Sequence, residues 1–164
     1  MRELFSFPNP VNEVAARVVA AGVVLLSVTL LTTGWTWLLV PLALGFLARV
    51  LTGPTLSPLG RLATQVVAPA LPVPAKFVPG PPKRFAQGIG ATLSTAAVVL
   101  HFGFGATTAA SVLVAMIAGA AFLEAAFAFC LGCHAFALLM RMGVVPAEVC
   151  EECNDIWSRQ PEPV

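Results

Sequence analysis

Long stretches of this chain carry no charge, and this feature constrains its fold more than any other. Between Phe85 and Met140 the only formally charged side chain is that of Glu124. Across all 164 residues, 58% are hydrophobic and only 10% are charged, and the mean hydropathy is +0.88. Soluble domains carry about a quarter charged residues. We therefore predict an integral membrane protein whose 164 residues form a single membrane domain.

The apolar runs predict four membrane spans, since one crossing needs about 20 residues. The predicted spans are about 14–31, 35–51, 85–106 and 109–140, followed by a cysteine-containing tail, 141–164. Short uncharged turns, TTGWTW and FGFGATT, join the first two and the last two spans, and their aromatic residues are typical of membrane interfaces. The expected fold is all-α, a four-span transmembrane helix bundle. Many small residues in the last two spans favour close helix packing and disfavour a wide channel.

The segment between the second and third predicted spans is basic. It has no acidic residue and contains Arg61, Lys76, Lys83 and Arg84, with Arg49 just before it. The positive-inside rule assigns such a loop to the cytoplasm, so both termini are expected there as well. The formal net charge of +1 leaves no other clustered basic face, and we expect no nucleic-acid partner.

This basic segment divides into a helix and a connector. Ser57 as N-cap and Pro58 at the first helical position predict a short amphipathic helix that ends near Ala68. Such a helix would rest on the inner membrane surface, and its apolar face would comprise Leu59, Leu62, Ala63 and Val66. The following stretch, APALPVPAKFVPGPPKR, is too rich in proline for a helix or a central strand. We expect a stiff, extended connector.

All four cysteines lie near the end of the chain, in two C-x-x-C pairs, Cys130/Cys133 and Cys150/Cys153. Cys130, Cys133 and His134 are spaced i, i+3 and i+4, which sets them on one face of a helix. The predicted fourth span puts that face at the cytoplasmic end of a continuous membrane helix. The chain between the pairs is long enough for the second pair to return to the first.

Three interpretations of the cysteines stay open. In the first, all four thiolates hold a structural metal, and the spacing of the pairs suits zinc. A turn usually presents the thiolates to zinc, whereas CLGC is expected inside a helix. In the second, the pairs form a dithiol relay, in which a protonated His134 lowers the pKa of the Cys133 thiol. A helix C-terminus and the neighbouring Glu151 and Glu152 would raise thiol pKa values. In the third, the thiols are inert.

Two further polar residues lie inside predicted spans. Glu124 must face the bundle, because an exposed carboxylate in a bilayer is costly. Glu124 lies on a different helical face from the cysteines, and its hydrogen-bond partner is expected among Ser94, Thr95 and His101. The alternative is that Glu124 serves as a proton or substrate group. His101 itself is expected to form an interhelical hydrogen bond. Near the N-terminus, the spacing of Glu13 and Arg17 allows an ion pair within one helix.

Several motifs together resemble one family of bacterial membrane proteins. They are FPNPVNEVAARV, GPTLSPLGRLATQVVAPAL, PPKRFAQGIG, CLGCHAF and CEEC, in this order from about Phe7 to Trp157. The chain resembles the domain of unknown function 4395 family. The resemblance implies a four-span protein of the bacterial cytoplasmic membrane. It also implies association with thioredoxin-like or rhodanese-like proteins, and hence thiol or sulfur chemistry.

These observations predict a membrane component of thiol redox or sulfur transfer. Its tentative redox residues are Cys130, Cys133, Cys150 and Cys153, tuned by His134, and a thioredoxin-like or rhodanese-like protein is the expected soluble partner. Quinone-coupled thiol oxidoreductases share this architecture, so a quinone is a candidate cofactor. Two alternatives stay open. One is a non-enzymatic scaffold with zinc on the four cysteines, and the other is a transporter of a small sulfur species.

Overall fold

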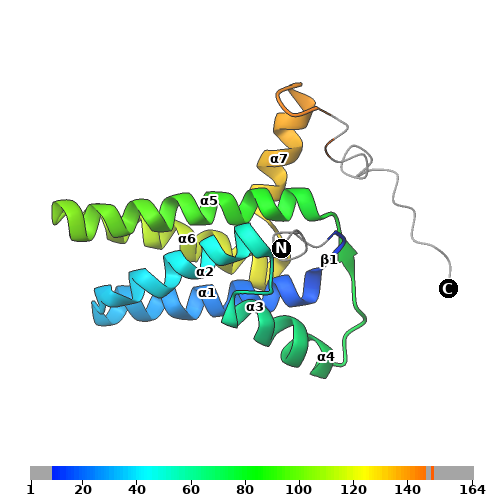
Figure 1. Cartoon of the computed structure of the whole chain (residues 1–164), viewed down its shortest axis with the longest axis horizontal. Helices are drawn as coiled ribbons and strands as arrows, with labels where there is room; N and C mark the ends of the chain where they lie inside the picture. The colour runs from blue at the N-terminus through cyan, green and yellow to red at the C-terminus, as the bar shows by residue number, and fades with distance from the viewer. Residues whose placement is uncertain (1–8, 147–148, 150–164) are drawn as a thin grey trace.

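The computed structural model describes residues 9–146 and 149, and within them the chain is a bundle of helices with one very small sheet (Figure 1). The predicted all-α class is confirmed in this coarse form. Three helices are long and apolar enough to cross a membrane. They are α1 (Glu13–Thr33), α5 (Gly80–Val98) with its π-helical extension η4 (Val99–Gly103), and α6 (Thr107–Phe127).

α1 corresponds to the first predicted span, and its sequence defines both of its ends. The side chain of Asn12 accepts a hydrogen bond from the Val14 amide at 2.9 Å and caps the N-terminus. Gly34 adopts φ +70° and caps the C-terminus, where its N–H donates to the carbonyl of Leu30. A left-handed residue at this position favours glycine, which has no Cβ. The helix therefore begins at Glu13, directly after its N-cap residue Asn12.

The second predicted span, 35–51, is formed by a short turn and a helix. A 3₁₀ turn, η2 (Thr36–Leu38), leads into α2 (Leu39–Thr52), and together they fall below the length of the other three apolar helices. α2 packs against α5, and Phe46 fills the contact at Gly90, where an added methyl group would overlap the aromatic ring. The predicted role of small residues in close packing is confirmed at this position.

The bundle core lies where α1, α2, α5 and α6 meet, and it is built almost entirely from aliphatic side chains. α1 packs against α6, and α5 packs between α2 and α6. The turns of the two helical hairpins lie at one end of the bundle, opposite the sheet (Figure 1). The most buried core residues are Leu39, Leu42, Ala97 and Val114.

The basic segment folds as three short helical pieces at the other end. α3 (Pro58–Leu62), the π-helical η3 (Ala63–Val67) and α4 (Ala68–Ala70) follow one another. The Ser57 side chain caps α3 by accepting from the Gly60 amide, so that prediction is confirmed. Of the predicted apolar face, Ala63 is fully buried against the bundle, whereas Leu62 and Val66 are half exposed. The π-helical turn changes the angular spacing on which that face was based.

The proline-rich connector ends in a two-stranded antiparallel sheet. β2 (Phe77–Val78) pairs with β1 (Val11–Asn12), just before α1. Glu13 contacts Lys76 twice, since its amide donates to the Lys76 carbonyl at 2.8 Å and its carboxylate lies 2.9 Å from the Lys76 ammonium. The predicted Glu13–Arg17 pair is wrong because both side chains have partners on other segments.

The predicted fourth span, 109–140, is not one helix. α6 ends at Phe127 because Ala128 adopts the left-handed conformation, with φ +56°, and its amide donates back to the Glu124 carbonyl. A new helix, α7 (Leu131–Arg141), begins after Cys130 and packs against α5, leaving the bundle steeply (Figure 1). Gly143 lies just after its end, close to the predicted stop. Alanine carries no sequence signal for such a break.

Candidate functional site

The described charges gather at one end of the bundle. α1 and α5 begin there and α2 and α6 end there, so the two helix C-termini offer carbonyl acceptors to cations. The Arg17 guanidinium donates to the carbonyls of Ala125 and Ala126 at 3.0–3.2 Å, and Arg84 Nε donates to the carbonyl of Val50 at 3.1 Å. The hydrogen bonds explain why basic residues from separate segments collect at this end.

Cys130 is the N-cap residue of α7. It has an extended backbone, with φ −90° and ψ 103°, and its Sγ accepts a hydrogen bond from the Cys133 amide at 3.4 Å. A sulfur at an N-cap faces the positive end of the helix dipole, which stabilises a thiolate. The expectation that this pair sits at a helix C-terminus is therefore wrong, and the sign of the dipole effect is reversed.

The two thiols of the CLGC motif differ in their acidity. Both are free, Cys130 is buried and Cys133 is partly exposed. The pKa of Cys130 is lowered, mainly by a hydrogen bond from the Cys133 side chain and against the effect of burial. The pKa of Cys133 is raised, because its S–H donates that bond and because it too is partly desolvated. The pair therefore favours a single thiolate, located on Cys130.

His134 supports this turn through the backbone of Cys130 and the ring of Phe129. Its Nδ1–H donates to the backbone carbonyl of Cys130 at 3.0 Å. The ring also packs against Phe129, with centroids 4.2 Å apart. The imidazole thus holds the peptide that leads into α7, and its role here is to position Cys130.

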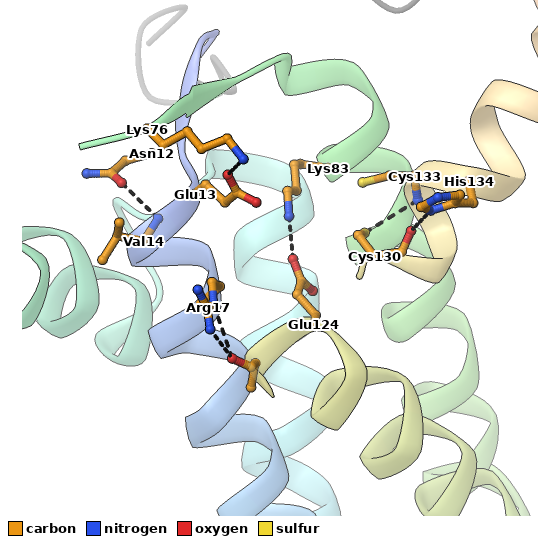
Figure 2. Close-up of polar contacts among 11 residues, drawn as sticks. Asn12, Glu13, Val14, Arg17, Lys76, Lys83, Glu124, Cys130, Cys133 and His134 are labelled. Carbon is orange, nitrogen blue, oxygen red and sulfur yellow. Dashed lines mark hydrogen bonds and ion pairs between the residues drawn. The ribbon is translucent and has the colours of Figure 1, made fainter. Parts of the chain in front are cut away.

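The buried ion pair beside the cysteines was missed from sequence. Lys83, in the first turns of α5, lies 2.5 Å from Glu124 of α6, with both side chains largely buried. Figure 2 shows Lys83 extending toward Glu124, with Cys130, Cys133 and His134 on one side of the pair. The positive charge of Lys83 acts to lower the pKa of both cysteines, although other effects raise the pKa of Cys133 overall. The predicted partners of Glu124 are wrong: Ser94 bonds to carbonyls of its own helix, and His101 contacts Thr107 at the far end.

A sequence signal for this pair did exist. Pro81 and Pro82 stand in the first turn of α5, and proline at that position marks a helix start. Lys83 therefore belongs to the helix, where its side chain can reach inward, and not to the preceding loop.

A cavity of about 300 Å³ adjoins Cys130 and Glu124. It lies between α5, α6 and the start of α7, and its remaining walls are mainly aliphatic. Gln87 and Ala86 line it from α5, and Met116 and Ile117 line it from α6. Cys130 is buried from bulk solvent, and it borders this space.

The first cysteine pair contacts the bundle at a glycine. The backbone of Gly132, between the two cysteines, lies so close to α5 that an added Cβ would come within 2.6 Å of the Ala86 Cα. Gly132 therefore allows α7 to pack directly on α5 and brings the CLGC turn beside Lys83.

We expect Gly132→Ala to destabilise the fold by about 1–3 kcal/mol through overpacking against backbone. It should also slow thiolate reactions of Cys130, because the turn must move away from Lys83. The measurement is chemical unfolding in detergent micelles together with thiol alkylation. Gly88→Ala is the matched control, since Gly88 lies on α5 with nothing within 4 Å of an added Cβ. Equal effects of the two substitutions would contradict the close packing at Gly132.

The structure brings together only part of the predicted site. Cys130, Cys133 and His134 lie at one turn with Glu124 nearby, whereas His101 is at the opposite end of the bundle. Cys150 and Cys153 lie outside the described residues. Within residues 9–146 and 149, no group of three or more potential metal ligands is found.

Comparison with known proteins gives one match. The family model described as domain of unknown function 4395 matches residues 11–141, which is most of the chain and includes the CLGC motif. Neither the curated proteins nor the solved structures yield a match.

Proposed function

Because the chain belongs to the domain of unknown function 4395 family, whose description assigns no reaction, we propose a function from the site itself. The protein is a membrane-embedded dithiol centre that exchanges electrons with a soluble thioredoxin-like protein. It lies in the bacterial cytoplasmic membrane, with α2 as a fourth crossing segment. Its charged end and both termini face the cytoplasm. This orientation follows the positive-inside rule, since the described residues include seven Lys and Arg side chains and only two carboxylates.

One observation carries this proposal: Cys130 caps α7, and the backbone amide of its C-x-x-C partner Cys133 donates a hydrogen bond to its sulfur at 3.4 Å. A stabilised thiolate favours the reduced pair, and so it makes the corresponding disulfide a better electron acceptor. Lys83 adds a cation beside the same sulfur. The centre is therefore suited to accept electrons from another dithiol.

The exchange proceeds in two displacements. A thiolate of the partner attacks Sγ of Cys133, which is the more exposed sulfur, and the Cys130–Cys133 bond breaks. The bonding electron pair leaves on Cys130, the better leaving group because its pKa is lowered. The partner's second thiolate then attacks the mixed disulfide and releases Cys133, which takes up a proton because its pKa is raised. Two electrons pass to the pair and the partner becomes a disulfide.

Cys150 and Cys153 form a second C-x-x-C pair on the same chain. We propose that this pair relays electrons between the soluble partner and Cys130/Cys133 by the same type of exchange. A C-x-x-C spacing suits this role because it closes a small disulfide ring and exchanges readily.

The test uses the oxidised full-length protein in lipid nanodiscs, mixed with a reduced bacterial thioredoxin. We expect the thioredoxin to become oxidised while the CLGC peptide gains two hydrogens in its mass spectrum. Cys130→Ser and Cys133→Ser should each abolish the exchange at this peptide. Leu138→Ser is the control, since it changes an exposed residue of α7 and keeps both thiols.

Two results would contradict the proposal. One is undiminished exchange at this peptide in the Cys130→Ser variant. The other is native protein that carries about one zinc per chain on four cysteines that no oxidant converts to disulfides, as a structural metal site would.

A further inference from the structure

A second cavity, of about 250 Å³, lies on the other side of the Lys83–Glu124 pair from Cys130. It is bounded by the starts of α1 and α5, the end of α2 and the α3–η3 segment. Most of its wall is apolar. The polar residues that border it are Asn12, Arg49, Thr64, Lys83 and Gln87.

Two of these residues are buried cations. Arg49 is 5% exposed and Lys83 is 8% exposed. Arg49 donates from Nε to Gln87 Oε1 at 3.0 Å and from an Nη to Ser57 Oγ at 3.4 Å, and its guanidinium lies 4.6 Å from the centre of the Phe46 ring. All of these contacts are to neutral groups, so none of them balances the charge of Arg49.

The described carboxylates do not balance both cations either. They are Glu13, which pairs with Lys76, and Glu124, which pairs with Lys83. Glu124 forms its ion pair with Lys83, and within residues 9–146 and 149 no carboxylate lies within ion-pair distance of Arg49, so the Arg49 guanidinium has no direct counter-ion there. Burying an uncompensated charge is costly, and an anion at this position would remove the cost.

We propose that this cavity binds an oxyanion of the phosphate or sulfate type, held by Arg49 and Lys83. A guanidinium presents planar pairs of donors that match such oxygens, and an ammonium adds a point charge. The group is carried by a free ion or by the headgroup of an anionic phospholipid, since the cavity is at the charged end of the bundle and has apolar walls. The inference goes beyond the proposed thiol exchange and does not depend on it, because Cys130 borders the other cavity.

The test measures anion binding by the full chain. Phosphate and thiosulfate are titrated calorimetrically into protein in phosphatidylcholine nanodiscs. In a parallel arm, native mass spectrometry counts phosphatidylglycerol retained from mixed nanodiscs. We expect Arg49→Gln to weaken binding about tenfold or more, as the loss of a charge-assisted hydrogen bond implies. Arg61→Gln is the matched control, because Arg61 is an exposed cation that does not line the cavity.

A cavity-filling variant separates binding from folding. Ala16→Leu adds volume to the cavity wall and keeps every charge, so it should also abolish binding if the anion occupies this space. If the wild-type chain binds phosphate or thiosulfate and both Arg49→Gln and Ala16→Leu abolish this binding, the inference is supported with a free ion as the ligand. If the wild-type chain retains phosphatidylglycerol and both variants lose it, the inference is supported with a lipid headgroup as the ligand. Absence of binding in both arms, or equal losses in Arg49→Gln and Arg61→Gln, would overturn it.

Discussion

Lys83→Gln is expected to destabilise the folded chain by about 3–5 kcal/mol, because it leaves the Glu124 carboxylate buried without its cation. The two side chains lie 2.5 Å apart and only 10% and 15% exposed. Unlike a surface pair, this one has little access to solvent that could replace the lost partner. The measurement is the free energy of unfolding in mixed micelles, with circular dichroism as the signal for unfolding.

Two controls sharpen this prediction. Lys76→Gln removes the other described ion pair, but the Lys76 side chain is 68% exposed, so its loss should cost less than about 1 kcal/mol. The double variant Lys83→Met/Glu124→Leu removes both charges, and it should be much more stable than Lys83→Gln. If Lys83→Gln costs no more than Lys76→Gln, the pair is not buried as described.

Cys133→Ala is expected to slow the reaction of Cys130 with a small thiosulfonate about tenfold near neutral pH. The largest cause of the lowered Cys130 pKa is the hydrogen bond from the Cys133 side chain, and such a bond to a charged group contributes about 1.5–3 kcal/mol. Without the donor the pKa of Cys130 rises, and less thiolate is present at a given pH. The reaction rate, followed by peptide mass spectrometry, should therefore reach its half-maximum at a higher pH.

Cys133→Ser is the matched control, because its hydroxyl can donate the same hydrogen bond. It should restore most of the rate while it still prevents disulfide formation within CLGC. In the wild-type chain, Cys133 should react only at a pH above the ordinary thiol range, since its pKa is raised. Equal rates for Cys133→Ala and Cys133→Ser would show that the Cys133 side chain does not stabilise the thiolate.

Much of the bundle could be predicted from sequence. Three of the four predicted spans correspond to α1, α5 with η4, and α6, because uncharged apolar runs have few other ways to fold. The cap at Ser57 was likewise predictable, since serine before proline has one strong preference at a helix start. Glu124 was correctly expected to need a partner inside the bundle.

The structure of the candidate site was harder to predict. The helix break depends on the left-handed conformation of Ala128, and an alanine in the sequence does not indicate such a conformation. Because of this break, Cys130 is the N-cap of a new helix and does not lie near the C-terminus of a continuous one. The Lys83–Glu124 contact joins positions 41 residues apart. Tertiary packing, including the close contact of Gly132 with Ala86, decides which basic residue meets the carboxylate, and local patterns do not contain that information.

The one-sided distribution of charge also bears on how the chain reaches its membrane. Each helical hairpin carries its charges at its two ends and has an uncharged turn, TTGWTW or FGFGATT. Inserting either hairpin from its charged side, which we propose is the cytoplasmic side, moves no carboxylate, ammonium or guanidinium group across the bilayer with the turn. The costly transfer of a formal charge through hydrocarbon is avoided, and Lys83 and Glu124 can meet without either crossing the whole membrane.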